Sequence, residues 1–326
     1  MVTTSGQSSY TPLLLRTTAS LELISTAMRS QRYDRDPAGE GWGSVYDDTD
    51  AILGKITRQR PAGGKAELLT ALESYPDQVR ARYYWNEFDG SQLEYDAQGE
   101  ASLFHRLRAC DVTLADTGNE GEYFVLLSES QPRRLKRVLD GLTDTIEAVS
   151  DAVFMNQDDN PLSFGDDDFF LWVLYRATHD AALNGNLALV EIRSLSNESI
   201  RSRITSMGKG VDLSRPELVT LISDQSNRFG PVRFVVWSED LQLTLYLQIK
   251  KSGEFSIYRG DSYYDDPDMF DLPEEEQRLR LLQDAAFHVI PELKHLYSLD
   301  AEWRDTNRAD FYAYAKSAMK AYMESL

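Results

Sequence analysis

The chain has 326 residues, of which 42% are hydrophobic and 11% aromatic. This length favours two domains, and the apolar content excludes an intrinsically disordered chain, which lacks the side chains needed to build a core. Asp and Glu number 53 against 34 Lys and Arg, so the formal net charge is −19. The longest apolar run, 169–175, is far shorter than the roughly 20 residues of a membrane span, so we expect no membrane partner.

The acidic composition has three interpretations. Only nine of the basic residues are Lys, and Asp is more frequent than Glu. A solvated surface adapted to high salt is the interpretation we favour, because abundant carboxylates keep a protein soluble when charges are screened. A nucleic-acid mimic would need its carboxylates on one face, and here they are spread along the chain. A generally acidic protein from an ordinary cytoplasm is the third interpretation.

The predicted elements alternate between strands and helices without a regular βαβ order. Strand-like runs occupy residues 79–85, 112–115, 123–127, 187–192, 232–237, 241–248 and 254–258, with hairpin turns at 118–121 and 250–253. Helical periodicity is found at 132–154, at 271–297 and from Asn307 onwards, where Phe311, Tyr314, Ala318, Met319 and Tyr322 are expected on one buried face. The segment 155–168, rich in Asn, Asp, Pro and Gly, is the predicted linker. This pattern predicts an α+β fold with antiparallel strands and flanking helices, in two halves, 1–155 and 156–326.

A weak internal similarity indicates that the two halves are duplicated. Residues 67–70 (Glu-Leu-Leu-Thr) match 217–220 (Glu-Leu-Val-Thr), and the Trp85-Asn-Glu87 segment matches Trp237-Ser-Glu239. The run 99–104 then matches 253–258. The repeat would therefore relate 50–110 to 198–262. It requires gaps, and one of them shifts a strand by a residue, which only a β-bulge would accommodate.

The second half of the chain also carries a family resemblance. The segments that carry it are the run 169–176, the strand Glu191-Ile-Arg-Ser194, and the stretch from Phe229-Gly-Pro-Val232 to 253–260. In these segments the chain resembles uncharacterised acidic proteins of halophilic archaea. The resemblance implies a salt-adapted cytoplasm and no particular activity.

Localisation follows from the cysteine content and the start of the chain. The single cysteine, Cys110, excludes an intrachain disulfide and is typical of a reducing compartment. The first residues show neither the basic nor the apolar region of a secretory signal. We therefore expect a cytoplasmic protein.

Four cations at the start of the helix predicted from Pro132 are the first candidate site. Arg133, Arg134, Lys136 and Arg137 lie where the helix macrodipole favours acidic residues. Such a cluster would suit phosphate groups of a nucleic acid, or a carboxylate-rich partner. The alternative is pairing within the chain, including Lys136 with Asp140 one turn further on.

Two Trp–Glu segments are the second candidate site. If the halves are duplicated, Trp85 with Glu87 and Trp237 with Glu239 occupy equivalent strand ends beside a central cleft, where they would contact a partner. The alternative is that both indoles are core residues, which is the usual role of Trp in strands.

Motifs for known chemistry are absent from the sequence. The four histidines form no His-Glu-x-x-His motif, and one cysteine excludes the common thiolate zinc sites. The acidic clusters 166–168 and 265–268 lack the spacing of a calcium loop, and Asp166 to Asp168 suit the start of a helix. We therefore expect no metal and no cofactor.

These observations predict a non-catalytic cytoplasmic protein that binds or scaffolds another macromolecule, with a protein as the expected partner. The first alternative is a nucleic-acid-associated protein that contacts phosphates through Arg133–Arg137. The second is a metal-dependent hydrolase with carboxylate ligands. Nothing in the sequence fixes the oligomeric state.

Overall fold

The computed structural model describes residues 6–33, 39–43, 66–69, 75–95, 98–99, 101–150, 153–198, 204–208, 211, 215–226, 228–269, 272 and 274–324. The chain forms two compact units: the N-terminal unit is Tyr10–Pro161, and the C-terminal unit is Leu162–Leu326 together with Met1–Ser9. The division lies inside the segment 155–168, six residues after the predicted boundary. The first nine residues belong with the C-terminal unit, as shown by Gly6, whose carbonyl accepts from the Arg259 amide at 3.0 Å.

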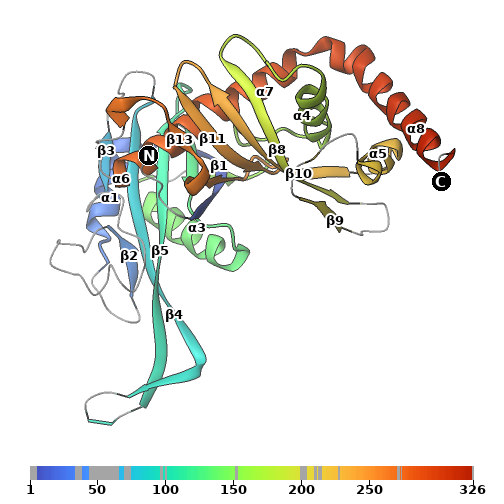
Figure 1. The fold of residues 1–326 in the computed structure, drawn as a ribbon. Coiled ribbons are helices and arrows are strands. Elements are labelled where there is room, and N and C mark those ends of the chain that lie inside the picture. The colour runs from blue at the N-terminus through green and yellow to red at the C-terminus, as the bar shows by residue number, and fades with distance from the viewer. Residues whose placement is uncertain are drawn as a thin grey trace. The chain divides into compact units, whose positions relative to one another are not determined.

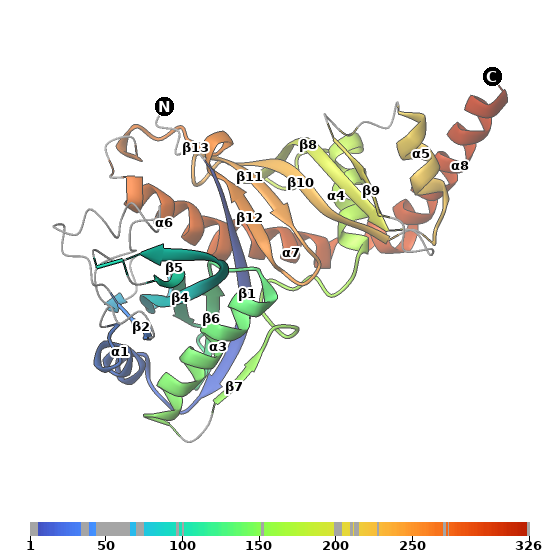
Figure 2. The ribbon, with the colours of Figure 1, turned by 90° about the horizontal axis from the view of Figure 1, so that it is seen from below.

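The fold is α+β with antiparallel pairing throughout the named strands, as predicted. In the N-terminal unit the strand order is β2-β4-β5-β6-β1, with β3 beside β4 and β7 beside β1 (Figures 1 and 2). These strands are β1 (Gln7–Thr17), β2 (Glu40–Trp42), β3 (Glu67–Leu69), β4 (Gln78–Tyr95), β5 (Ala101–Asp116), β6 (Glu122–Leu127) and β7 (Val153–Asn156). The predicted turn at 118–121 joins β5 to β6, and Gly118 and Gly121 supply its positive φ angles.

Helices α1 (Leu21–Ser30) and α3 (Pro132–Glu147) cover one face of this sheet. Every second residue of β4 from Val79 to Trp85 is buried against them, because side chains alternate between the two faces of a strand. Gly141 lets α3 approach β4 closely, since a Cβ atom there would lie 2.3 Å from the Tyr83 ring. The helix predicted to reach 154 ends at Glu147. Val153 and Phe154 pair with β1 instead, so strand pairing prevails over the helical periodicity.

In the C-terminal unit the strand order is β12-β11-β10-β8-β9, and β13 pairs with β11 beside β12. The strands are β8 (Leu187–Glu198), β9 (Ile204–Met207), β10 (Arg228–Ser238), β11 (Leu243–Ile249), β12 (Phe255–Tyr258) and β13 (Tyr263–Tyr264). The predicted turn at 250–253 joins β11 to β12, with Gly253 at φ +84°. Leu243, Leu245, Leu247 and Ile249 of β11 are all fully buried, and they define the inner face of the sheet.

The helices of this unit include α4 and α7, which lie on the inner face in Figure 1, and α5 and α8, which pack against each other. They are α4 (Asp168–His179), α5 (Pro216–Ser223), α6 (Glu274–Asp284), α7 (Ile290–Leu299) and α8 (Arg308–Glu324). Two 3₁₀ turns, η1 (Arg259–Asp261) and η2 (Pro267–Met269), precede α6, and two π-helical turns, η3 (Ala285–Val289) and η4 (Trp303–Asn307), flank α7. The turn η3 precedes Pro291, which has no amide hydrogen to continue an α-helix. None of the helices in the described ranges is long and apolar enough to cross a membrane.

The face predicted for the C-terminal helix is correct for Phe311, which is buried, and in part for Ala318 and Met319, which are partly buried. The buried residues of α8 are Phe311, Tyr312 and Ala315, whereas Tyr314 is 51% exposed and Tyr322 is 44% exposed. The buried positions 311, 312 and 315 and the partly buried positions 318 and 319 form one regular helical stripe, which passes through Tyr312 rather than through Tyr314 and Tyr322.

The predicted duplication of 50–110 and 198–262 is not confirmed, and the described parts of the two segments differ in structure. Residues 67–69 form strand β3, but their counterparts at 217–219 lie in helix α5. Strands β4 and β5 pair directly, whereas their counterparts β10 and β12 are separated by β11. Residues 44–65, which include the start of the first copy, lie outside the described residues. The central cleft inferred from the repeat therefore has no structural basis.

Asp300 holds the helices of the C-terminal unit together. Its carboxylate accepts hydrogen bonds from the Trp172 indole at 2.8 Å, the Trp303 amide at 2.8 Å and Arg176 at 3.3 Å. Trp172 and Trp303 are both fully buried. Burial acts to raise the pKa of Asp300, but the hydrogen bonds from Trp172, Trp303 and Arg176 outweigh it and the pKa is lowered.

Replacing Asp300 by Ala leaves the indole of Trp172 buried without an acceptor. We expect Asp300→Ala to lower the free energy of unfolding by about 2–4 kcal/mol at pH 7, measured by urea denaturation. The effect should shrink below about pH 4, because a carboxylate with a lowered pKa stabilises the fold above its unfolded pKa and loses that contribution as it protonates. The control Glu302→Ala changes an exposed residue nearby and should have little effect. Equal losses in the two variants would contradict this role of Asp300.

Candidate functional site

The four predicted cations lie in the first turns of α3, a region with no acidic residue. Arg134 is held by Glu87 of β4, with its Nε 2.6 Å from Oε1 and its Nη2 2.9 Å from Oε2. Arg108 of β5 donates to the same carboxylate at 2.8 Å. The hydrogen bond from Arg134, which outweighs the effect of burial, and a second one from Arg108 lower the pKa of Glu87 to about 2. The structure thus joins two candidate residues, Arg134 and Glu87, in one partly buried ion pair.

The remaining cations of the cluster are largely paired as well. Arg137 Nε lies 2.7 Å from Glu40 Oε2, and Lys136 Nζ lies 2.6 Å from Asp140 Oδ2, as the sequence spacing predicted. Arg133 is exposed, and in the described part of the chain its side chain contacts no carboxylate. Intramolecular pairing therefore accounts for three of the four cations, and they do not converge on an open anion site.

The two tryptophan candidates have local roles. Trp85 is 1% exposed and packs in the core of the N-terminal unit beside Tyr83. Trp237, at the end of β10, is partly exposed, and its indole nitrogen donates to Glu239 at 3.0 Å. Trp85 and Trp237 thus differ in burial and partners, and only Trp237 lies at a surface.

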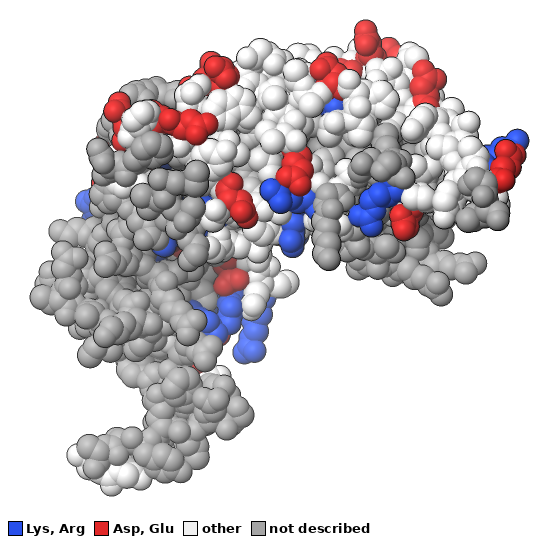
Figure 3. Space-filling model, in the orientation of Figure 1, with Lys and Arg blue, Asp and Glu red and all other residues white. Residues whose placement is uncertain are grey.

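The surface that includes Trp237 is the face of the C-terminal sheet opposite its helices. Because Phe234 and Val236 of β10 point inward, Arg233, Val235 and Trp237 point outward, and the register places them beside Gln248, Tyr246 and Thr244 of β11. We call this surface the outer sheet face and define it by Val190, Arg193, Arg233, Val235, Trp237, Tyr246, Gln248 and Tyr258. In Figure 3 much of the surface over these strands is uncharged, with basic side chains next to acidic ones.

Two tyrosines and two arginines form an ordered cluster on the outer sheet face. The rings of Tyr246 and Tyr258 are stacked with centroids 4.4 Å apart. Arg193 lies over the Tyr246 ring at 5.8 Å and Arg233 over the Tyr258 ring at 5.1 Å, which are cation–π distances. Gln248 Oε1 accepts from both Arg233 and Tyr258 at 2.9 Å. This network fixes long side chains in place before any partner binds.

The two arginines differ in charge compensation. Arg193 Nε is 2.8 Å from Glu191 Oε2, whereas Arg233 has no carboxylate within 4.0 Å among the described residues. Burial raises the pKa of Tyr246 and of Tyr258, so both phenols are neutral at pH 7. Val235 and Tyr246 are themselves covered by their neighbours, with 6% and 9% exposure, so the face presents the partly exposed rings of Trp237 and Tyr258, neutral hydrogen-bonding groups and one uncompensated cation.

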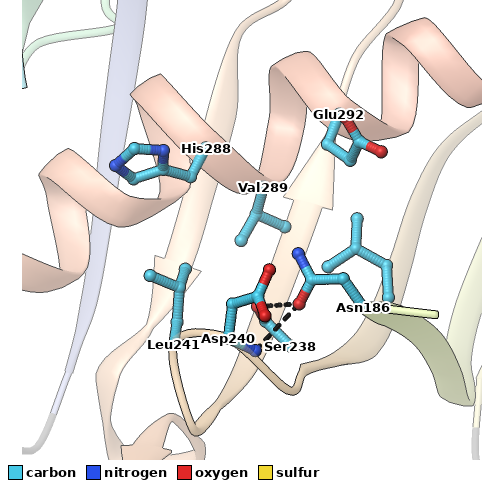
Figure 4. A pocket seen from close by; sticks show the side chains of 8 residues that line it. Asn186, Ser238, Asp240, Leu241, His288, Val289 and Glu292 are labelled. Carbon is cyan, nitrogen blue, oxygen red and sulfur yellow. Dashed lines mark hydrogen bonds between the residues drawn. The ribbon is translucent and has the colours of Figure 1, made fainter. Parts of the chain in front are cut away.

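A pocket of about 100 Å³ lies in the same unit, between the β10–β11 turn and the η3–α7 helix (Figure 4). Its apolar lining comes from Leu187, Leu241 and Val289, of which Leu187 and Val289 are fully buried. Its polar lining consists of Asn186, Ser238, Asp240, His288 and Glu292. Two carboxylates thus border an apolar floor.

Hydrogen bonds orient the polar groups of this pocket. Asn186 Oδ1 accepts from Ser238 Oγ at 3.1 Å and from the Asp240 amide at 2.9 Å, so its amide nitrogen is left facing the pocket (Figure 4). Asn184 donates to Glu292 Oε1 at 2.8 Å. The carboxylate of Asp240 has no hydrogen-bond donor among the described residues. A ligand in the pocket could therefore donate hydrogen bonds to the carboxylates of Asp240 and Glu292 and accept one from the amide nitrogen of Asn186.

His288 lies at the end of the pocket away from Asn186, with its ring turned outward in Figure 4. Burial lowers its pKa, and Arg280 acts in the same direction, whereas Asp284 opposes them. Its ordinary pKa is already about 6.5, so the imidazole is neutral at pH 7. It adds no positive charge to counter Asp240 and Glu292.

The acidic cluster 166–168 serves the fold. Asp166 accepts from the Tyr297 hydroxyl at 3.0 Å, and Asp168 pairs with Arg308 at 2.7 Å and accepts from the Trp303 indole. These residues lie at the start of α4, as the sequence predicted. No group of three or more His, Cys, Asp or Glu side chains suited to a metal occurs within the ranges that the structure describes.

Sequence reasoning missed both the outer sheet face and the pocket. The outer face was predictable in part, because Arg233, Val235 and Trp237 alternate with apolar residues in a predicted strand. The sequence signals for the pocket were weaker. They are the Asn184-Gly-Asn186 turn, the Asp240-Leu241 turn and Pro291, three residues after His288. Bringing 186, 240 and 289 together requires knowledge of which elements pack, and one sequence does not contain it.

Removing the carboxylate charge of Glu87 should destabilise the N-terminal unit. We expect Glu87→Gln to cost about 1–2 kcal/mol at pH 7, since it weakens two partly buried ion pairs. Because the folded pKa is about 2, the wild-type advantage should be complete above about pH 4.3 and should vanish as the pH falls through 2. Asp140→Asn, in the exposed pair with Lys136, is the control and should cost under about 0.5 kcal/mol. Urea denaturation at several pH values measures both, and a pH-independent difference would contradict the prediction.

Comparison with known proteins adds no family to this description. No family model matches the chain. No curated protein shows significant similarity to it.

Proposed function

We propose that the chain is a non-catalytic binding protein that recognises another macromolecule, and that this partner is a protein. The observation that carries the proposal is the outer sheet face, where Tyr246, Tyr258, Arg193 and Arg233 form an ordered cluster. Val190 beside them is 60% exposed, and no helix covers this face in the described part of the C-terminal unit.

The chemistry of this face is that of a protein interface. Tyr, Trp and Arg are the residues that contribute most to protein–protein binding, because they combine large contact areas with few rotamers to fix. Here their side chains are already held by stacking and by Gln248, so little conformational entropy is lost on binding. A partner with planar groups and a carboxylate opposite Arg233 would complement the face.

Nucleic acid is the weaker candidate partner. Binding to phosphates derives its strength from several uncompensated cations that release counterions. The cluster at Arg133–Arg137 keeps three of its four cations in ion pairs, and Arg193 on the outer sheet face is paired with Glu191. With a net charge of −19, the chain would also repel a polyanion at long range.

Catalysis has less support than binding. The carboxylates of Asp166 and Asp168 are used by Tyr297, Trp303 and Arg308, which argues against a hydrolase that uses them as metal ligands. The thiol of Cys110 is fully buried, and burial raises its pKa, so it is not an available nucleophile. We place the protein in the cytoplasm because this single free thiol suits a reducing compartment.

A photo-crosslinker on the outer sheet face tests the proposal. We replace Val190 by benzoylphenylalanine and, as a control, Leu299 at the end of α7, which is 63% exposed in the same unit. In lysate of the source cells, the probe at 190 should yield a discrete protein adduct that the probe at 299 does not. Adding Arg233→Glu should reduce that adduct roughly tenfold or more, because it places a like charge opposite the partner's acidic group.

Three outcomes would overturn the proposal. Identical adducts at positions 190 and 299 would mean that the contacts are random. An adduct at position 190 that nuclease removes would show that the partner is a nucleic acid. No adduct at position 190, in a protein whose circular dichroism spectrum is unchanged, would mean that the outer sheet face binds no partner.

A further inference from the structure

We infer that the pocket between the β10–β11 turn and the η3–α7 helix binds an aliphatic cation, an ammonium or guanidinium group on a short hydrocarbon chain. This site is separate from the outer sheet face. Its ligand chemistry is shared by the side chain of a Lys or Arg residue of a partner and by a free amine, such as a polyamine.

Size restricts the ligand. The pocket has a volume of about 100 Å³, which is room for more than one water molecule, since one ordered water needs about 10–15 Å³ on the same measure. Pockets for drug-sized ligands are about 300–1,000 Å³, so a ligand as large as a nucleotide does not fit here. The end of one extended side chain does.

The lining then selects the chemical class. Leu187, Leu241 and Val289 supply an apolar floor that suits methylene groups, while Asp240 and Glu292 border it with negative charge. Lys and Arg side chains match this lining, because each combines an apolar stem with a positively charged end. An anion would meet two carboxylates and a neutral imidazole, so the pocket is unsuited to phosphate or to an acidic peptide.

The electrostatic surroundings do not cancel this preference. His288 is neutral at pH 7, and the nearest cation that affects it, Arg280, is already 3.8 Å from Asp284. Glu292 accepts one hydrogen bond from Asn184, which leaves further acceptor sites on its carboxylate. Asp240 is exposed and accepts no hydrogen bond among the described residues, so its carboxylate is available to an incoming cation.

The test is an NMR titration that uses the side-chain amide of Asn186 as the reporter, because its nitrogen faces the pocket. Butylammonium should shift this signal in a saturable way at millimolar concentrations, and pentanol, which is of similar length and neutral, should not. Asp240→Asn and Glu292→Gln should each weaken the affinity roughly three- to tenfold. Glu302→Gln removes the same charge outside the pocket lining and should leave the affinity unchanged.

Two further titrations show whether the cation is a side chain of a partner or a free amine. A short peptide with one central Lys, compared with its norleucine analogue, represents a partner's side chain, and spermidine represents the free amine. Tighter binding of either probe than of butylammonium assigns the source and supports the inference. No shift at Asn186 with any cation would overturn it, as would equal weakening by Glu302→Gln and Asp240→Asn, which would indicate non-specific attraction. Neither result would bear on the outer sheet face, which the crosslinking experiment tests.

Discussion

The alternation of side chains along β10 and β11 is the constraint on which the C-terminal unit depends. Phe234 and Val236 of β10 and all four inward residues of β11 are completely buried, so the register of this strand pair is fixed. A shift by one residue would expose the whole apolar set and bury Arg233 and Gln248. The same register therefore secures the core and determines which side chains reach the outer sheet face. Gly230 supports it, because a Cβ atom there would lie 2.3 Å from the Phe170 ring of α4.

Carboxylates of this acidic chain hold buried or partly buried donors in both units. In the N-terminal unit carboxylates are used to hold arginines, as Glu87 holds Arg134 and Arg108, and Asp111 holds the buried Arg82. In the C-terminal unit Asp300 and Asp168 accept from the buried indoles of Trp172 and Trp303. Exposed cations in the described part of the chain, such as Arg133 and Arg228, also lack a carboxylate partner, and Arg233 differs from them because it is partly buried over the Tyr258 ring.

The fold class and most strands were predictable from the sequence because apolar alternation is a local signal. The runs at 232–237 and 254–258 lie within β10 and β12, and both predicted turns carry a glycine with positive φ. The errors lie where contacts between segments far apart in the sequence determine the secondary structure or the burial of a residue. Val153 pairs with β1 rather than extending α3, and α8 buries Tyr312 and Ala315 rather than Tyr314 and Tyr322. The repeat failed for a related reason: residues 67–69 and 217–219 are similar in sequence, but one segment pairs as a strand and the other packs as a helix.

The same limit applies to the candidate sites. The lysine–aspartate pair at 136 and 140 follows from helical spacing alone, so the sequence predicted it correctly. The partner of Arg134, in contrast, is 47 residues away in the chain, and no spacing rule identifies it. Glu87 was selected as a partner-facing residue for its place beside Trp85, yet it is an internal counterion. A charged residue on a strand is assigned to the interior or to a partner only when the neighbouring elements are known.

The end of β10 connects the two surfaces of the C-terminal unit. Trp237 and Ser238 are adjacent in sequence and point to opposite sides of the sheet, one to the outer sheet face and the other to the pocket. From Arg233 to Ser238 the strand advances by about 17 Å. A standard interface buries about 800 Å² on each partner, an area roughly 28 Å across. A partner of that size that also continues around the β10–β11 turn reaches both surfaces, and it meets a cation on one side and two carboxylates on the other. Such opposed charges would fix its orientation, because reversing the partner would set like charges against each other.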